Sequence, residues 1–452
     1  MHSKVRDLIF TPLVEGSLSQ IIPDFTMDLP DGSVTAPAQL CVSDGKFHFA
    51  IHFMDGLPPL TLLNPKKTTF TAEDTFTVSG QVGGELAFEC RDVYPSFNAT
   101  TRSRGTSTLF LESKKMHLPA EGADTMLSSE LSELLGTPIS CDDERPLKFR
   151  SHTIFHGPKL RMMNGTSETC QKNDFLGEAS SSSLDTHLFQ GNGYEAALIQ
   201  KDRELHMHVR STESHSWDEN SWTEVVKLLE QAVGFTHGFQ PWSVYREVRM
   251  DHRVTERWIG CHQALDQTGL SPISLQLWAG VSGMKNDPLH QIVATIADGL
   301  GALPPSIQDG IKNLLWQFRA MELSDLAPTT KLLMVCAVLD GMMKVLTGKT
   351  DPKQKAGTGK TWKAGCEAAG LSWDAWGSPL FELFGKYRHD LAHGWLWLSS
   401  YDEPTTYFTD YPKLCGGLNI LVAAACGYKG QILANPFRSQ AVEIESIRRA
   451  TR

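Results

Sequence analysis

Hydrophobic and polar residues alternate along the first third of the chain, and this period of two predicts β-strands. The clearest strand covers residues 47–53, where Phe47, Phe49, Ile51 and Phe53 share one face. Turn-forming Gly, Pro, Asp and Asn residues separate the further strands, which is typical of a β-sandwich or barrel. These strands are predicted at residues 69–71, 76–78, 86–90, 107–111 and 152–155, with one short helix at 128–135.

A second region, with both strands and helices, is expected to begin near residue 173, after a polar interval. Residues 205–210 alternate as a half-buried strand. Residues 223–233 are predicted to form an amphipathic helix that ends at Gly234.

Beyond Pro304 the apolar residues recur every three or four positions, and this spacing predicts helices. Ser306 caps the first helix and Thr330 precedes the second. A polar loop at residues 347–360 leads to a short helix that ends near residue 369. A fourth helix is predicted with Pro379 in its first turn, and a fifth at residues 411–428.

The predicted fold class is therefore α+β with several domains, as the length of 452 residues also suggests. A β-rich N-terminal region, sandwich-like or barrel-like, is followed by a C-terminal all-α helical bundle. The expected parts are a β-rich domain at 1–172, a second α+β part at 173–303, a helical domain at 304–435 and a C-terminal tail at 436–452.

Composition narrows the classes of function. The net charge of −10 argues against a broad nucleic-acid-binding surface, so any RNA contact is expected in a cleft or an interface. The longest apolar run is about half of a membrane span, and Pro12 and Glu15 interrupt any signal sequence, so we expect a cytoplasmic protein with no membrane partner. The nine cysteines include no CxxC pair, which disfavours a disulfide framework or a zinc ribbon.

The fourth helix carries the residues best suited to chemistry. Its apolar residues share one stripe, and at about 100° per residue Arg388, His389 and His393 fall outside that stripe. Cleavage of RNA by its own 2′-OH needs a group that exchanges a proton near neutral pH, for which His393 is suited. It also needs a fixed positive charge on the phosphate, which Arg388 supplies without a metal or other cofactor.

The segment Tyr387-Arg-His-Asp-Leu-Ala-His-Gly394 resembles the Rx4–6H signature of the HEPN superfamily of ribonucleases. The helices around it are similar to those of the ApeA-like HEPN group of bacterial anti-phage proteins, in which a long β-rich region precedes a helical domain. In the C-terminal helical third the resemblance includes the motif. In the N-terminal two thirds it is a resemblance of architecture only. It implies that Arg388 and His393 are the catalytic pair and that His389 takes the polar position after the arginine.

The same resemblance implies a function in abortive infection. Two copies would meet so that their Arg/His pairs form one metal-independent endoribonuclease site, in a homodimer or larger homo-oligomer. The substrate would be RNA, with tRNA as one candidate, and a phage-derived trigger would release the nuclease from restraint by the N-terminal region. Asp340, near the end of an apolar stretch on the preceding helix, and Asp390 within the motif are supporting candidates.

Other readings stay open at this stage. The motif could belong to a non-catalytic HEPN module that binds a nucleotide or a partner protein. Gly357-Thr-Gly-Lys-Thr361 resembles the end of a P-loop, but Gln354 replaces the first glycine and no strand precedes it, so a P-loop NTPase is the weaker alternative. Lys360 in this loop could still contact RNA.

Two further groups of residues are candidates for binding. The basic residues between Trp242 and Trp258 are interpreted mainly as a solvated face and alternatively as an RNA contact through Arg246, Arg249 and Arg253. A metal is disfavoured both at the i, i+4 pair His389 and His393, which lacks a third ligand, and at a loose histidine cluster. That cluster is His206, His208 and His215, of which the first two are explained as exposed strand residues.

Overall fold

The structure is a computed structural model of the whole chain. It describes residues 6–14, 17–29, 32–43, 45–53, 75–103, 106–118, 149–156, 186–201, 204–212, 215–238, 243–250, 253–260, 289–324, 326–348, 359–392, 403–435 and 440–448. The expected strand at 69–71 and the expected helix at 128–135 lie outside these residues.

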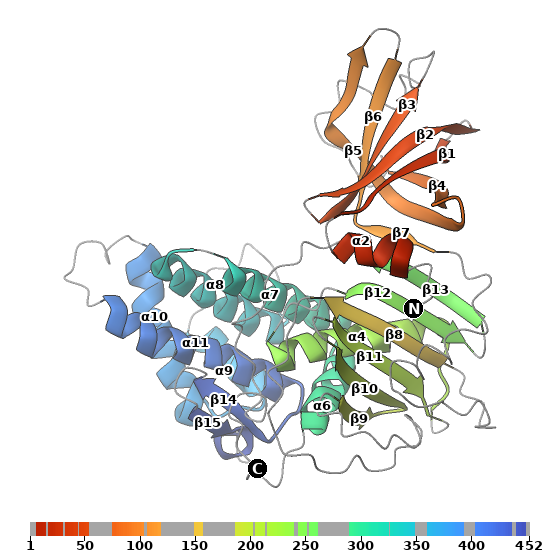
Figure 1. Ribbon diagram of the computed structural model, residues 1–452. Coiled ribbons are helices and arrows are strands. Elements are labelled where there is room, and N and C mark those ends of the chain that lie inside the picture. The colour runs from red at the N-terminus through yellow and green to blue at the C-terminus, as the bar shows by residue number, and fades with distance from the viewer. Residues whose placement is uncertain are drawn as a thin grey trace.

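The described chain is α+β, with strands in its N-terminal part and helices in its C-terminal half, as the sequence predicts (Figure 1). Six antiparallel strands close into a barrel in the order β4-β1-β2-β3-β6-β5, because β5 also pairs with β4. These strands are β1 (Ser19–Leu29), β2 (Gly32–Ser43), β3 (Lys46–Phe53), β4 (Phe76–Val82), β5 (Leu86–Ser103) and β6 (Thr106–Ser113).

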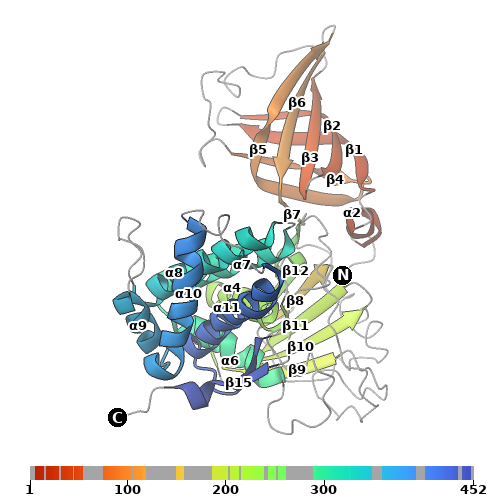
Figure 2. The same ribbon diagram turned by 90° about the vertical axis from the view of Figure 1, so that its left-hand side faces the viewer.

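The barrel closes through the long strand β5. Its first half pairs with β4 up to Val93, and its second half pairs with β6 from Tyr94 onward. Asp92 lies next to this change of partner with φ of 56°, a conformation that Asp tolerates better than most residues. Phe25, Phe49 and other side chains of alternate strand positions fill the interior. The helical turns η1 (Arg6–Phe10) and α2 (Thr11–Val14) lie at its base (Figure 2).

The hydrogen-bonded ladder continues from β5 into an open sheet in the order β7-β13-β12-β8-β11-β10-β9. Its strands are β7 (Lys115–His117), β8 (Phe149–His156), β9 (Thr186–Gly191), β10 (Tyr194–Lys201), β11 (Glu204–Ser211), β12 (Ser243–Met250) and β13 (Arg253–Gly260). Below the barrel, helices α4 (Glu219–His237) and α6 (Leu289–Ala302) pack between this sheet and the remaining helices (Figures 1 and 2).

Helix α4 is longer than the sequence predicts. Asp218 caps its start by accepting a hydrogen bond from the amide of Ser221 at 2.9 Å. The helix passes through Gly234 and ends at Gly238, which adopts the left-handed conformation with φ of 75°. The expected stop at Gly234 is therefore wrong. Gly234 is buried within the helix, where tertiary packing outweighs its poor helix propensity.

Five helices form the C-terminal part, with α8 at the centre in contact with α7, α9, α10 and α11. A prolyl residue begins α7 and α8, where its missing N–H costs nothing. The expected cap at Ser306 is therefore wrong, since this residue lies inside α7. A short hairpin and a 3₁₀ turn follow, so residues 440–448 are folded rather than a free tail. These elements are α7 (Pro305–Leu323), α8 (Pro328–Leu346), α9 (Gly359–Ala368), α10 (Ser378–Ala392), α11 (Glu403–Ala425), β14 (Gln431–Asn435), β15 (Gln440–Glu443) and η6 (Ile444–Ile447).

The hydrophobic interior falls into two clusters. One fills the barrel and reaches Ile154, Tyr245 and Ile259 of the open sheet. The other runs without interruption from the opposite face of that sheet through α4 and α6 into the C-terminal helices. A single core therefore crosses the expected boundary at residue 304. Among the described helices, none is long and apolar enough to span a membrane.

Candidate functional site

The apolar stripe predicted for α10 faces the interior. Leu380, Phe384 and Tyr387 are all buried, while Glu382 and Lys386 on the same helix are exposed. This confirms the predicted orientation for the part of α10 whose side chains are described. The side chain of Leu391 and the whole of Trp395 lie outside that part.

Helix α10 is fixed to α11 by a charged hydrogen-bond network. The hydroxyl of Tyr387 donates to Asp410 Oδ2 at 2.5 Å, and Lys413 pairs with Asp410 Oδ1 at 2.9 Å. Burial alone would raise the pKa of Asp410, but the hydrogen bonds from Tyr387 and Lys413 and the charge of Lys386 bring it below its ordinary value. Asp410 is therefore ionised at neutral pH, and Tyr387 has a fixed orientation one residue before Arg388.

Arg388 lies half-buried where α10 meets the helices beneath it. The centre of its guanidinium is 5.7 Å from the ring of Phe384, within the range of a cation–π contact. The same phenyl ring packs against Trp362 of α9 with ring centroids 4.4 Å apart. The guanidinium of Arg388 thus lies over a phenyl ring that belongs to the core.

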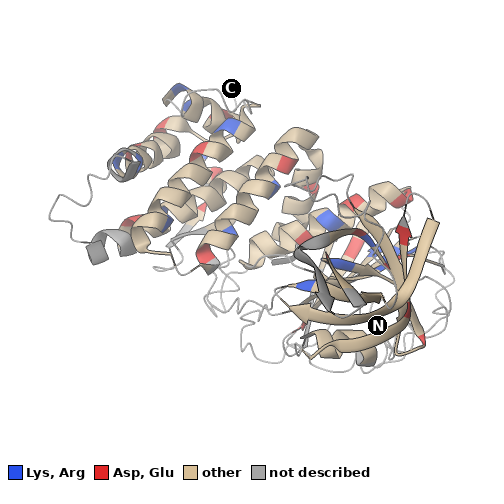
Figure 3. Cartoon of the chain, turned by 90° about the horizontal axis from the view of Figure 1, so that it is seen from above, with Lys and Arg blue, Asp and Glu red and all other residues tan. Residues whose placement is uncertain are grey.

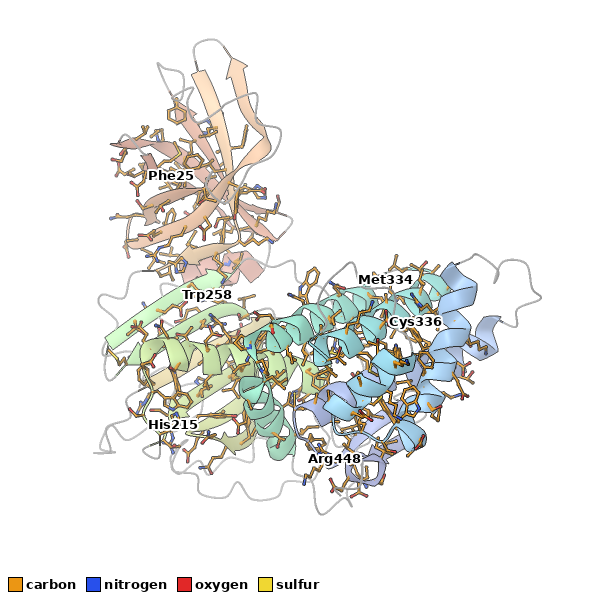
Figure 4. All side chains as sticks on the ribbon, turned by 180° about the vertical axis from the view of Figure 1, so that it is seen from behind. Phe25, His215, Trp258, Met334, Cys336 and Arg448 are labelled. Carbon is orange, nitrogen blue, oxygen red and sulfur yellow. The ribbon has the colours of Figure 1, made fainter. Side chains whose placement is uncertain are left out.

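Asp340 of α8 contacts Trp362 of this aromatic pair and is largely buried. Trp362 Nε1 donates to Asp340 Oδ1 at 3.2 Å, and Lys344, one turn along α8, pairs with Oδ2 at 3.0 Å. Burial raises the pKa of the Cys336 thiol to about 12, while the positive charge of Arg388 acts in the opposite direction. Cys336 is one turn before Asp340 on α8 (labelled in Figure 4), so the electrostatic influence of Arg388 reaches this segment.

Arg388 differs in its charge balance from seven other arginines among the described residues. Among the residues that the structure describes, no carboxylate lies within ion-pairing distance of its guanidinium. Seven other arginines each pair with a carboxylate: Arg91, Arg210, Arg246, Arg249, Arg257, Arg319 and Arg448. A half-buried guanidinium without a carboxylate is suited to bind an external anion such as a phosphate.

The structure describes the other residues of the predicted catalytic group only in part. The backbone of His389 and Asp390 belongs to α10, but their side chains lie outside the described residues. His393 directly follows the end of α10 and is also outside them. The structure thus places Arg388 and Asp340 in neighbouring helices and leaves the position of His393 as a prediction from sequence.

The basic stretch between Trp242 and Trp258 forms the hairpin of β12 and β13. Arg246 is buried and pairs with Glu230 of α4, and it also lies over the ring of Trp258. Glu247 accepts hydrogen bonds from Arg249 and Arg257 at 2.7 and 2.8 Å. Neither a solvated face nor an RNA-contacting patch therefore describes Arg246 and Arg249, since internal carboxylates neutralise both. The side chain of Arg253 is outside the described residues.

Lys360 is exposed in the first turn of α9, where it could still meet RNA. The element that precedes this region in the described chain is helix α8, whereas a P-loop requires a strand before its phosphate-binding loop. The P-loop alternative therefore lacks its structural context. Basic and acidic positions are interspersed along the described helices and form no single basic stripe (Figure 3).

The histidine cluster has a different membership from the one considered in the sequence. His206 and His208 are buried on β11, not exposed, and their third neighbour is His152 of β8. Burial, reinforced by the neighbouring histidines, lowers the pKa of His208 to about 3 and that of His152 well below its ordinary value. His215 is not part of this group, and its exposed ring packs against Trp217 with centroids 4.0 Å apart (His215 is labelled in Figure 4).

His152 carried no sequence signal of its own, since it is 54 residues from His206 and joins it only through strand pairing. No family model matches the sequence, and neither a curated protein nor a solved structure matches it significantly. The resemblance to the HEPN superfamily therefore stays a prediction, and the chemistry of the candidate site depends on the residues described above.

Proposed function

We propose that this chain is a metal-independent endoribonuclease of HEPN type in which Arg388 and His393 act on the scissile phosphate. The observation that supports it most is the state of Arg388. Its guanidinium is held by Phe384 at 5.7 Å, it is half-buried, and no described carboxylate neutralises it. Such a group has a fixed charge and a fixed position for a phosphate before any substrate binds.

In the proposed reaction the ribose 2′-oxygen attacks the adjacent phosphorus while the bond from phosphorus to the 5′-oxygen breaks. His393 exchanges protons with the 2′-hydroxyl or the leaving 5′-oxygen. Arg388 stabilises the additional negative charge of the phosphorane-like transition state through its paired N–H donors. The products are a 2′,3′-cyclic phosphate and a 5′-hydroxyl end, and His389 orients or assists the catalytic pair.

In this proposal Asp340 does not contact the substrate. It acts by fixing the packing of α8 against α9. Both of its carboxylate oxygens are engaged, one by Trp362 of α9 and one by Lys344. Trp362 in turn supports the phenyl ring on which Arg388 rests. Asp340 is therefore a positioning residue that fixes the aromatic support of the arginine.

The biological setting is part of the same proposal. The segment from Arg388 to His393 would meet its counterpart in a second copy, so that a homodimer or larger homo-oligomer carries the site. The chain would act in abortive infection, with the β-rich N-terminal region restraining the nuclease until a phage-derived trigger is present. RNA, with tRNA as one candidate, would be the substrate.

The test is RNA cleavage by the purified full chain in the presence of EDTA. Arg388→Ala and His393→Ala are each expected to lower the cleavage rate by about 100-fold or more, the usual loss for an acid/base or charge-stabilising group. Glu382→Ala is the matched control, since it removes an exposed charged side chain from the same helix, outside the network around Asp410, and should leave the rate unchanged.

Normal cleavage by either Arg388→Ala or His393→Ala would refute the nuclease proposal. If the wild-type chain binds RNA or nucleotide without cleaving it, the alternative of a non-catalytic binding module is favoured. Arg388→Ala would then weaken that binding.

A further inference from the structure

Three histidines are brought to one face of the open sheet by the pairing of β8 with β11. His152 of β8 lies directly opposite His208 in the antiparallel register. His206 is two residues before His208 on β11, so its side chain projects from the same face. The opposite face packs on α4, where Ser151 and Thr153 bond with Trp222 and Glu230.

The three imidazoles lie close together and are almost completely buried. Their exposed fractions are 4% for His152, 0% for His206 and 4% for His208. The ring of His152 stacks on His208 with centroids 4.2 Å apart and lies 5.3 Å from His206. One nitrogen from each ring lies within 4.8 Å of the others. Buried histidines gathered at this spacing supply the ligand type that zinc and its neighbours prefer.

Two of the ring nitrogens have no hydrogen-bond partner among the described residues. These are His152 Nδ1 and His208 Nε2, both inaccessible to solvent. A buried polar atom left in this way destabilises the fold, by about 1–3 kcal/mol in typical cases. A bound cation with imidazole ligands would give such a nitrogen a partner and remove this cost.

His206 is already oriented as a metal ligand usually is. Its Nε2 lies 3.0 Å from a carboxylate oxygen of Glu204, which favours a proton on that nitrogen. Its Nδ1 then presents a lone pair toward His152 Nε2, 3.1 Å away. A carboxylate behind a coordinating histidine is the common outer-shell arrangement of protein zinc sites, since it fixes the tautomer and the ring.

From these contacts we propose that His152, His206 and His208 bind one transition-metal ion of the zinc type, with Glu204 orienting His206. Tetrahedral zinc places its nitrogen ligands about 3.4 Å apart, so the stacked rings must rotate toward one another when the ion binds. Three imidazoles without a thiolate favour zinc, nickel or copper over magnesium or calcium. The three ligands leave at least one coordination position for a fourth donor.

The positive charges that face this group from the neighbouring strands are partly offset. Glu247 of β12 is opposite His152 in the register, and its carboxylate is occupied by Tyr245, Arg249 and Arg257. The field of the two arginines on the ion is therefore offset in part by Glu247. The ion would join β8 to β11 within the sheet, where it has a structural role separate from the metal-independent reaction proposed at Arg388.

The test is metal content and zinc affinity of the full chain, purified without a polyhistidine tag. We expect one zinc per chain by elemental analysis, and after chelation one equivalent of Zn²⁺ should rebind and raise the thermal midpoint. Co²⁺ in its place should give the d–d absorption of a nitrogen-ligated site. His208→Phe retains a flat ring against His152 but offers no nitrogen, and it is expected to weaken Zn²⁺ binding by 100-fold or more.

His215→Phe is the matched control, since it removes an exposed histidine outside the cluster and should keep one zinc per chain. If His208→Phe does not fold, His206→Phe takes its place, and the metal content of the wild type decides independently. The proposal would be overturned if the wild type contains no zinc and does not rebind it. It would also be overturned if the wild type and the folded variant bind Zn²⁺ with equal affinity. Arg388→Ala should retain its zinc, so a failure here is distinguishable from a failure of the nuclease proposal.

Discussion

Arginine side chains in this protein differ in charge balance at the residue scale. Arg246 and Arg257 are buried, and each lies against a carboxylate that neutralises it. Arg388 has a similar position at the edge of a core but no such carboxylate among the described residues. The first kind holds the sheet and α4 together, whereas under the proposed function the charge of Arg388 would bind a phosphate.

The first prediction concerns Glu247, which accepts from Tyr245, Arg249 and Arg257 at 2.7 to 2.8 Å. Glu247→Gln removes its charge and leaves two arginines with little exposure uncompensated. We expect the free energy of unfolding in urea at pH 7 to fall by about 3–5 kcal/mol. Glu224→Gln, which breaks an exposed pair with Lys227, should change it by less than about 1 kcal/mol. Equal effects of the two substitutions would contradict the burial argument.

The same carboxylate predicts a dependence on pH. Burial opposes ionisation of Glu247, but Arg257 and Arg249 outweigh it, so its pKa lies below the ordinary 4.5. Its contribution to stability is therefore complete above about pH 4.5 and is lost as the pH falls through the lowered pKa. In urea unfolding from pH 7 down to pH 3, wild type should lose more stability than Glu247→Gln. Parallel curves would show that Glu247 is not the group involved.

At the scale of elements, α6 connects the sheet to the helical part, and its backbone at Gly299 lies very close to the backbone of Cys426. A Cβ built on Gly299 would lie 2.1 Å from the carbonyl oxygen of Cys426, at the end of α11. The helix also contacts α4 and β9. Only glycine permits this distance, so the absence of a side chain at Gly299 sets the separation of α6 and α11.

Gly299→Ala is therefore expected to lower the free energy of unfolding by about 1–3 kcal/mol, because backbone must move to admit the methyl group. Gly385→Ala is the matched control within α10, where a Cβ would meet no described atom within 4 Å. That change should be neutral or stabilising by up to about 1 kcal/mol, since alanine has the higher helix propensity. Chemical denaturation of both variants measures the difference, and a neutral Gly299→Ala would contradict the close approach.

Elements with a local signal were the ones that could be predicted from the sequence. Strict alternation located β3, and the apolar stripe of α10 gave both the helix and its buried face. Helix α6 was missed, although Ile292, Ile296 and Leu300 recur at helical spacing. The burial of Arg246 and the grouping of His152 with His206 depend on which strands and helices pack together. No pattern along the chain contains that information.

At the scale of the whole molecule, two cores divide the chain differently from its predicted domains. The barrel has its own interior, while the open sheet, α4, α6 and the C-terminal helices share a second one. The α+β class is confirmed, with a β-rich N-terminal region and helices in the C-terminal half. The continuous core indicates that the helical part depends on the sheet layer for its stability.

A chain that begins at residue 304 tests this dependence. It lacks α6 and α4, against which α7 packs through the contact of Arg319 with the carbonyl of Phe235. We expect the fragment to retain helical circular dichroism but to lose near-ultraviolet signal and bind a hydrophobic dye, as partly packed states do. Cooperative unfolding at the midpoint of the full chain would show that the helices form an independent domain.

The most direct measurement of the central claim is the rate of RNA cleavage by the full chain in EDTA, with end-group analysis of the products. The proposed chemistry at Arg388 predicts cleavage that leaves 2′,3′-cyclic phosphate ends, reduced by about 100-fold or more in Arg388→Ala. Glu382→Ala, which removes an exposed charge from the same helix, should cleave at the wild-type rate. Cleavage that persists at the wild-type rate in Arg388→Ala, or products with a free 3′-hydroxyl, would contradict the account.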